Sequence, residues 1–317
     1  MRILITGIAG CGGSALARLL LRYEYQVTGV DIIAPLEASR LADILDKIDY
    51  RWRAVGDLTE EDVRGHDIIC DFAAQADVPM GYFSPRWTCQ QNLPELIHLL
   101  EIARGASVRK FIYPGSGTIF GRPLYLPIDE NHPVTPANPY SATKAAAELL
   151  CLAYYRCYGV PVIILRNGVV YGPYMRKEIF IYKFLANIMQ GLPVVIEGGD
   201  QTRDPCYTDD AMQAWQRIIE APESTVIGES FQISTGQEYS VLEIARKCME
   251  IVGNNVETEI VDYRPGEKGM RECFDISKAR TILGYNPNVS IEEGLRLTAD
   301  WVEKELAVNG SFEKATK

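Results

Sequence analysis

The first half of the chain alternates short apolar runs with segments whose apolar residues have helical spacing. The apolar runs have strand length and occupy residues 2–6, 26–30, 67–72, 108–113 and 161–165. Helical spacing occurs between them, at residues 14–21, 93–103 and 141–155. Runs that are apolar throughout fit strands buried on both sides, so the alternation predicts an α/β fold, a doubly wound parallel sheet with helices on both faces.

The second half is less regular, with helical patterns at residues 178–190, 240–252 and 291–305. It contains no repeat, no low-complexity stretch and no flexible linker. We expect a larger unit over residues 1–170, to which residues 203–235 return. Residues 171–202 and 236–317 would then form a smaller α/β lobe, with a cleft between the two. The polar segment 309–317 is expected to be disordered.

Charge and composition exclude several classes of protein. The chain carries 42 acidic and 32 basic residues, a net charge of −10, and no run of Lys or Arg, which argues against a nucleic-acid partner. No apolar stretch approaches the roughly 18–20 residues of a membrane-spanning helix. The N-terminus lacks the features of a signal peptide. These observations predict a soluble, cytoplasmic protein.

Cysteine and histidine usage gives no sign of a metal site. The eight cysteines form no CxxC pair, and the three histidines lie far apart in the sequence. A zinc site needs clustered ligands, so we expect no metal. Scattered thiols of this kind are typical of buried cysteines in a reducing compartment.

A glycine-rich turn follows the first expected strand and opens a helix. Gly7, Gly10 and Gly13 let the backbone turn sharply and approach a pyrophosphate, which the free N–H groups of the helix terminus can bind. Asp31 ends the second expected strand, at the distance typical of a carboxylate that binds the adenosine ribose diol. Because such a carboxylate repels a 2′-phosphate, the pattern favours NAD over NADP as cofactor.

Two later segments add to the expected cofactor site. Asp57, followed by Leu58, comes after a third expected strand, between the runs at residues 26–30 and 67–72, and could reach the adenine, with a solvated loop acid as the alternative. Ala73, Ala74 and Gln75 follow the fourth strand, where small side chains leave room for a cofactor.

Tyr140 and Lys144 lie at i and i+4 at the start of the long helix, on one helix face. A phenol titrates near pH 10, and a neighbouring ammonium lowers its pKa, so the pair can provide a base. Lys144 can also donate to the hydroxyls of the nicotinamide ribose. Ser116 follows the fifth expected strand, at the sheet edge where ligands bind, and could orient the tyrosine and the substrate oxygen. Tyr140 would then take a proton from a substrate hydroxyl while hydride leaves the same carbon.

Taken together, these motifs resemble the extended short-chain dehydrogenase/reductase family, the nucleotide-sugar epimerases and dehydratases, over residues 1–305. The resemblance rests on the order of TGIAGCGG, GVD, GDL, DFAAQ, PGSGTIFG, NPYSATK, LRNGVVYGP, QTRDPCYTDD and YRPGE followed by DISKARTILGY. It implies a Rossmann-type NAD-binding domain, a smaller C-terminal substrate lobe, a nucleotide-diphosphate sugar as substrate, and a homodimer formed through a four-helix bundle.

The resemblance also implies roles for individual residues. Ser116, Tyr140 and Lys144 match the catalytic triad, and the cofactor contacts are extended by one more residue, Asn92. The substrate contacts that it implies are Thr118, Asn167, Arg203 and Arg264. The two arginines would hold the diphosphate, because guanidinium groups offer forked donors to phosphate oxygens.

Several positions depart from the family pattern. Cys11 and Gly12 replace an aromatic–aliphatic pair in the glycine turn, which we expect to loosen the local packing. Val169 stands where an asparagine often contacts the substrate, so the identity of the sugar cannot be inferred from well-known members of the family.

The two residues directly after Ser116 bear on the type of reaction. Dehydratases and decarboxylases of this family place acidic residues there, whereas this chain has Gly117 and Thr118, and neither can transfer a proton usefully. This difference favours a 4-epimerase that acts through a 4-keto sugar and regenerates NAD. A 4,6-dehydratase or decarboxylase would require an acid from elsewhere in the chain to reach the site. A keto-sugar reductase and a catalytically silent NAD-binding protein are less favoured.

Overall fold

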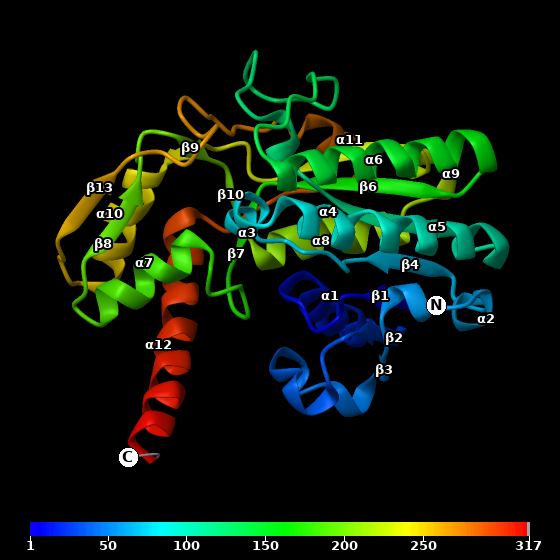
Figure 1. The fold of residues 1–317 in the computed structure, drawn as a ribbon, viewed down its shortest axis with the longest axis horizontal. Coiled ribbons are helices and arrows are strands. Elements are labelled where there is room, and N and C mark those ends of the chain that lie inside the picture. The colour runs from blue at the N-terminus through cyan, green and yellow to red at the C-terminus, as the bar shows by residue number, and fades with distance from the viewer. Residues whose placement is uncertain (316–317) are drawn as a thin grey trace.

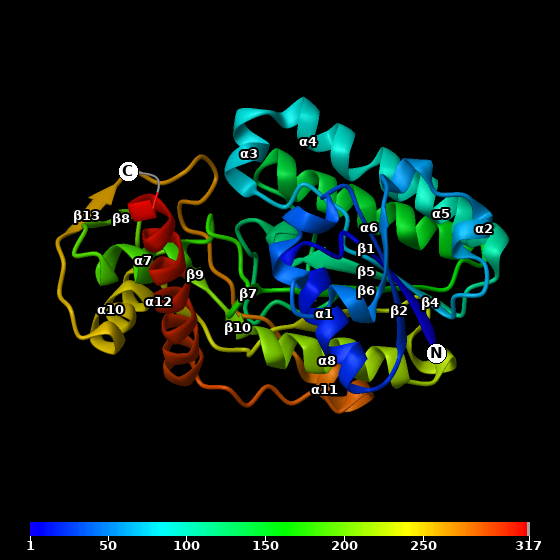
Figure 2. The same cartoon turned by 90° about the horizontal axis from the view of Figure 1, so that it is seen from below.

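The computed structural model describes the backbone of residues 1–315 and the side chains of residues 1–308. Its centre is a seven-stranded sheet in the order β11-β6-β5-β4-β1-β2-β3, and every strand pairs with its neighbours in parallel. The strands are β1 (Arg2–Thr6), β2 (Gln26–Asp31), β3 (Asp49–Trp52), β4 (Ile68–Asp71), β5 (Lys110–Ser116), β6 (Val162–Asn167) and β11 (Ser230–Ile233). Figures 1 and 2 show this sheet with helices on both sides. The predicted α/β doubly wound fold is confirmed.

Two sets of helices cover the two faces of the sheet (Figure 2). One face carries α1 (Cys11–Arg22), α8 (Thr208–Glu220) and α11 (Ser277–Leu283), which contact one another in pairs. The other face carries α2 (Glu60–Val63), α4 (Pro85–Asn92), α5 (Pro94–Ala106) and α6 (Pro139–Tyr158), with the short α3 (Val78–Phe83) beside α4 and α6. An apolar core lies on each side of the sheet. The sheet is therefore buried on both faces, as its apolar strands require.

Helix α6 shows how local chemistry sets the bounds of an element that carries the site. Pro139 takes the first helical position, and the Asn138 side chain accepts a hydrogen bond of 2.8 Å from the Ser141 backbone N–H. The helix ends at Gly159, which has a φ of +73°. These caps fix the position of Tyr140 in the first turn.

A second group of elements packs beside the sheet, on the left in Figure 1. It is built from α7 (Phe180–Met189), α10 (Val241–Val252) and α12 (Ile291–Ala315), with the parallel pair β8 (Val194–Glu197) and β13 (Thr258–Val261). The three helices and β8 share one apolar cluster of their own. Two short pairs lie between this group and the sheet, β7 (Val169–Tyr171) with β10 (Pro205–Tyr207) and β9 (Thr202–Arg203) with β12 (Tyr239–Ser240). The short helix α9 (Glu223–Val226) precedes β11.

The expected division of the chain agrees with these contacts in one place and departs from them in another. Residues of the segment 203–235 return to the sheet as α8 and β11. Phe274, Ile276, Ala279, Leu283 and Tyr285 also join the core beside the sheet, although the sequence assigns them to the smaller lobe. The two-lobe division stays a proposal, and these core contacts favour counting residues 274–285 with the larger unit.

The C-terminal helix α12 spans Ile291–Ala315, so it runs into the segment 309–317 for which we expected disorder. Residues 316 and 317 lie outside the described residues. Within the described part of the chain, no helix is long and apolar enough to cross a membrane.

Candidate active site

The glycine turn between β1 and α1 leaves no room for side chains at two of its glycines. Gly7 has a φ of +64°, and a Cβ there would lie 2.6 Å from the carbonyl carbon of Phe72. A Cβ on Gly13 would lie 2.5 Å from the carbonyl oxygen of Gly7. Helix α1 then begins at Cys11 with Gly10 as its N-cap, so its first N–H groups face the turn. This cradle fits a pyrophosphate, as the sequence predicts.

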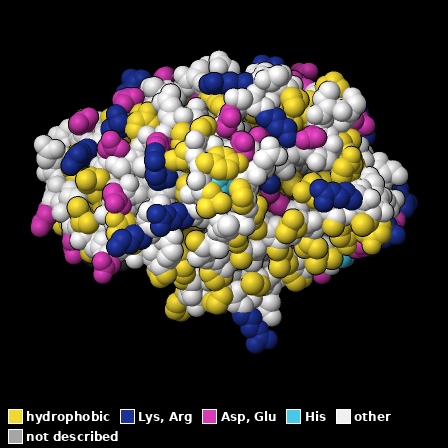
Figure 3. Space-filling model, turned by 90° about the horizontal axis from the view of Figure 1, so that it is seen from above, with side chains coloured by type: hydrophobic (Ala, Val, Ile, Leu, Met, Phe, Trp, Pro, Cys, Tyr) yellow, Lys and Arg dark blue, Asp and Glu magenta, His cyan; other side chains and the backbone are white. Residues whose placement is uncertain are grey.

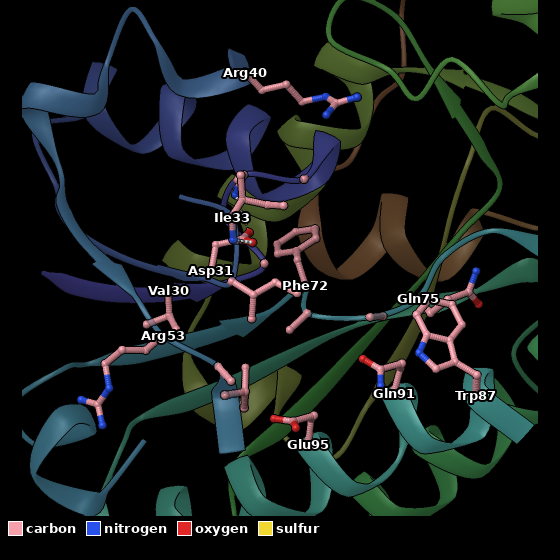
Figure 4. Close-up of a pocket in the computed structure, with 18 residues that line it drawn as sticks. Val30, Asp31, Ile33, Arg40, Arg53, Phe72, Gln75, Trp87, Gln91 and Glu95 are labelled. Atoms are coloured by element: carbon pink, nitrogen blue, oxygen red, sulfur yellow. Dashed lines mark hydrogen bonds between the residues drawn. The ribbon is translucent and has the colours of Figure 1, made fainter. Parts of the chain in front are cut away.

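A first cavity of about 420 Å³ opens beside the turn, at the carboxyl ends of β1, β2 and β4 (Figure 4). The Asp31 carboxylate lines it and accepts hydrogen bonds from the backbone N–H groups of Ala9 (2.8 Å) and Ile33 (3.1 Å). These two bonds hold the carboxylate at the mouth of the glycine turn, the place expected for a ribose-binding acid. Of the other predicted cofactor residues, the cavity is lined by Gly7, Gly10, Ala73, Ala74 and Gln75.

Three predicted cofactor residues line neither this cavity nor the second one beside the turn, which is described below. Asp57 is exposed, and Leu58 is buried in the core on one side of the sheet. Asn92 is also buried, and its amide accepts from the Gln75 backbone N–H (2.7 Å) and donates to the Gln75 carbonyl oxygen (3.0 Å). The Asn92 amide also donates to the Thr143 hydroxyl at 2.9 Å. Asn92 therefore fixes the loop after β4 against α6, and its direct contact with a cofactor stays a prediction.

A second cavity of about 540 Å³ brings the predicted catalytic helix to the glycine turn. Tyr140, Lys144 and Asn167 line it together with residues of the turn, including Gly13. Pro114 and Gly115 of β5 line it as well, directly before Ser116, whose hydroxyl shares a hydrogen bond of 2.9 Å with the hydroxyl of Thr118. The structure thus brings the predicted serine, tyrosine and lysine to one sheet edge.

The position after Ser116 is closed to larger side chains. Gly117 begins a short 3-10 turn, and a Cβ there would lie 2.3 Å from the ring of Phe274. A carboxylate side chain at residue 117 would therefore require Phe274 to move.

Tyr140 is buried, and burial is the main reason that its pKa is raised above the ordinary value of 10.0. The positive charge of Arg176 and a hydrogen bond with Ser116 oppose this increase. The lowering of the Tyr140 pKa by Lys144 that we expected stays a prediction. The Lys144 ammonium donates a hydrogen bond of 2.8 Å to the Tyr113 hydroxyl and lies 4.3 Å from the centre of that ring.

The environment of Lys144 lowers its own pKa from 10.5 to about 8, because burial disfavours the charged form. Asp71, at the end of β4, opposes this decrease by its negative charge. Asp71 is itself buried, which raises its pKa to about 6, and it accepts a 2.5 Å hydrogen bond from the Thr6 hydroxyl. Lys144 and Asp71 are thus two buried groups, each of which favours the charged form of the other.

Arg176 is a site residue that the sequence did not reveal. It lines the second cavity, forms an ion pair of 3.7 Å with Asp77, and acts on the pKa of Tyr140. It lies after Gly172 and Pro173 in the loop after β7, where the spacing of the residues gives no signal of a role. Asp77 and Glu178 line the same cavity, so two carboxylates from outside the Ser116 loop reach it.

Cys11 and Gly12, which depart from the family pattern, lie beside an aromatic residue from elsewhere in the chain. A Cβ on Gly12 would lie 2.6 Å from the ring of Phe72, and this ring packs on Trp215 with 4.5 Å between the ring centres. All four of these residues line the second cavity. The expected loosening is wrong at Gly12, because Phe72 fills the space that a larger residue would occupy.

The predicted diphosphate arginines line a third cavity of about 570 Å³, which borders the second one at Glu178. Arg203 pairs with Glu267 at 3.1 Å and with Glu272 at 3.8 Å. Arg264 pairs with Glu197, and more distantly with Glu267 at 3.8 Å. Glu267 thus lies between the two guanidinium groups, and in the free protein carboxylates occupy the donors that phosphate oxygens would need.

Val169 lies on β7 and packs against the cluster of the smaller group, while its neighbour Val170 lines the second cavity. Among the described residues, no group of three or more His, Cys, Asp or Glu could hold a metal ion.

The family model of GDP-mannose 4,6 dehydratase matches residues 4–298. A dTDP-glucose 4,6-dehydratase from Streptomyces niveus is 33% identical over 315 residues, covering 95% of this chain and 92% of that protein. An uncharacterized UDP-glucose epimerase from Bacillus subtilis is 30% identical over 308 residues, covering 93% of this chain and 96% of that protein. A solved structure, the UDP-glucuronic acid 4-epimerase from Bacillus cereus with UDP-glucuronic acid and NAD, has a TM-score of 0.90 at 28% identity and covers 96% of this chain and 100% of that one.

The chain therefore belongs to the GDP-mannose 4,6 dehydratase family of extended short-chain dehydrogenase/reductases, and the predicted family is confirmed.

Proposed function

We propose that this protein is an NAD-dependent nucleotide-sugar 4-epimerase of the UDP-glucose/UDP-galactose type. The observation that carries the proposal is the convergence of Ser116, Tyr140 and Lys144 on one cavity edge, with Gly117 beside Ser116 too crowded to be replaced by an acid. Relatives of both kinds, epimerases and dehydratases, support the reaction class.

The residues of the first two cavities fit NAD. Gly7, Gly10 and Gly13 face its pyrophosphate, and Asp31 binds the adenosine ribose. Lys144 turns from Tyr113 to the hydroxyls of the nicotinamide ribose. When bound, NAD supplies the acceptor that takes hydride from the sugar and gives it back.

Tyr140 acts as the base toward the sugar hydroxyl at C4. The positive charge of Arg176 favours its phenolate. The Lys144 ammonium would favour the phenolate as well once it has turned toward the nicotinamide ribose. Ser116 holds the C4 oxygen while it changes from hydroxyl to carbonyl, and Tyr140 then returns the proton. Turnover of the 4-keto sugar in the cavity exposes its other face and inverts C4.

The nucleotide sugar extends from the second cavity into the third. Asn167 lines the second cavity toward the sugar, and Thr118 would act there through its hydrogen bond with Ser116. Arg203 and Arg264 hold the diphosphate after Glu267 has released them. The charge balance supports this exchange of partners, because the negative diphosphate replaces carboxylates that already neutralise the two arginines.

A second candidate is a nucleotide-sugar 4,6-dehydratase. It is favoured by Asp77 and Glu178, which bring carboxylates to the second cavity from outside the Ser116 loop. Asp77 is already engaged by Arg176 and by the Met80 backbone N–H, which it caps at 3.0 Å. Glu178 is exposed, so it is the residue that this second candidate requires.

The proposal is tested by incubating the protein with UDP-glucose, UDP-galactose and their N-acetyl and uronic-acid forms. Interconversion of one C4 pair is expected, whereas no interconversion with bound NAD confirmed would refute the proposal. Tyr140→Phe should keep NAD affinity and lose nearly all turnover. Tyr155→Phe, on the same helix but away from the cavity, serves as the control and should keep the wild-type rate.

We also propose that two copies associate through α5 and α6 in a four-helix bundle. Apolar side chains gather on the face seen in Figure 3, and α5 and α6 expose Ile97, Leu149 and Tyr158. Light scattering should give the dimer mass for the wild type and the monomer mass for Leu149→Glu.

A cytoplasmic location is proposed as well, supported by eight cysteines that are all free thiols.

A further inference from the structure

Glu95 lies in the first turn of α5, and its side chain enters the first cavity (Figure 4). An acid in the first helical turn is usually explained by the helix dipole, and such an acid remains solvated. Glu95 differs, because its Oε2 atom is buried and has no hydrogen-bond partner among the described residues. A buried carboxylate oxygen without a partner is costly, so a donor supplied from outside the chain is expected there.

The Glu95 carboxylate lies at one end of the first cavity, near Gly56. A Cβ on Gly56 would lie 3.2 Å from each of the two Glu95 carboxylate oxygens. Glu95 therefore faces the segment after β3, where Ala54 and Val55 line the same cavity. This end lies across the cavity from Arg40, and Asp31 lies between them in Figure 4.

The other charged group near this end is already engaged. Arg53 donates to the Asp62 carboxylate at 2.8 Å and to the Asp57 carbonyl oxygen. Asp57 itself, which the sequence suggested for adenine, is exposed and does not line the cavity. Glu95 is thus the carboxylate that the structure offers at this end.

The chemistry of the cofactor matches such an acceptor. With Asp31 on the adenosine ribose, the purine lies between apolar side chains of the cavity, which include Val30, Val55 and Ala73. Adenine carries an exocyclic amino group that donates hydrogen bonds, whereas a 6-oxopurine carries an acceptor at that position. A carboxylate attracts the first and repels the second.

We propose that Glu95 accepts a hydrogen bond from the adenine amino group and makes this site select adenine over a 6-oxopurine. The inference rests on the proposed binding of NAD, but it adds a residue and a specificity that the sequence motifs do not assign.

The experiment compares the dissociation constants of NAD and nicotinamide hypoxanthine dinucleotide by calorimetry, with the full-length protein. Hydrogen bonds to charged groups suggest a preference of the wild type for NAD of roughly 10- to 100-fold. Glu95→Ala should weaken NAD binding and remove most of that preference. Glu95→Gln keeps an acceptor and adds a donor for the 6-oxo group, so it should reduce the preference by strengthening binding of the hypoxanthine analogue.

The matched control is Glu101→Gln on the same helix, where Glu101 accepts from the Tyr154 hydroxyl outside the cavity. It should keep the wild-type ratio, and thermal unfolding should show that all variants are folded. If the wild type binds neither dinucleotide, the proposed function fails. If NAD binds but the ratio is unchanged in Glu95→Ala and Glu95→Gln, the role of Glu95 is refuted and the proposed function stands.

Discussion

The contact between Gly12 and Phe72 makes a quantitative prediction about the departure in the glycine turn. In Gly12→Ala, the new Cβ would lie 2.6 and 2.7 Å from two carbons of the Phe72 ring, so the ring must move. Overpacking of this kind typically costs about 1–3 kcal/mol. Alanine also gains about 0.5–1 kcal/mol over glycine within a helix, so the net loss of unfolding free energy should be about 0–2.5 kcal/mol.

Without the Phe72 ring, Gly12→Ala should raise the free energy of unfolding instead of lowering it. The shorter side chain of Phe72→Leu leaves room for the new Cβ, so in that background Gly12→Ala should stabilise the protein by about 0.5–1 kcal/mol. The two substitutions should therefore be coupled by about 1–3 kcal/mol in a double-mutant cycle. Because Phe72 lines both cavities beside the turn, Gly12→Ala alone should also weaken NAD binding.

Urea unfolding of the four proteins measures the coupling, and calorimetry measures the NAD affinity. Additivity within about 0.5 kcal/mol would show that Phe72 does not fill this space in solution. Phe72 would then not be the reason that residue 12 is a glycine.

Two further predictions concern titration. Burial raises the pKa of Asp71 from 3.8 to about 6, so the folded chain keeps a proton that the unfolded chain releases in this range. Wild-type stability relative to Asp71→Asn should therefore fall as the pH rises from about 4 to 6, by up to about 3 kcal/mol. Denaturant titrations of both proteins across this window test the prediction, and a constant difference would contradict it. Arg176 lowers the pKa of Tyr140, so Arg176→Gln should move the base-dependent rise of kcat/KM to higher pH. Lys177→Gln, whose ammonium pairs with Glu305 at 3.4 Å, is the control, and equal shifts in both variants would remove Arg176 from this role.

The fold could be predicted because its signal is local and repeated. Strands buried on both faces are apolar throughout, and caps such as Asn138 and Gly159 mark helix ends in the sequence. The return of residues 274–285 to the main core could not be predicted from the sequence, because this short segment shows no apolar periodicity. Its packing partners lie on β11 and α8, which only the folded structure brings near it.

The site was predictable where its residues belong to recognisable motifs. Gly7, Gly13 and Asp31 follow from the backbone of a single strand–turn–helix unit. Arg176 comes three residues after the LRNGVVYGP motif and Glu95 three residues after Asn92, but no spacing rule assigns either side chain to a cavity. Only tertiary packing reveals them.

Spacing along a helix also gave an incomplete picture of charge. Tyr140 and Lys144 share a helix face, but the Lys144 ammonium extends to Tyr113 on β5, toward the buried charge of Asp71. The sequence cannot show which of several neighbours a long, flexible side chain chooses. In the proposed reaction Lys144 changes partner when the nicotinamide ribose is bound.

The proposed 4-epimerase oxidises and then reduces the sugar at the same carbon, C4. This property is tested with a nucleotide sugar that carries deuterium at C4, followed by mass and NMR analysis of the product. An epimerase must leave the deuterium at C4 of the inverted sugar, and this is the predicted result. A 4,6-dehydratase must instead produce a 4-keto-6-deoxy sugar that carries the deuterium at C6, and that result would contradict the proposed reaction.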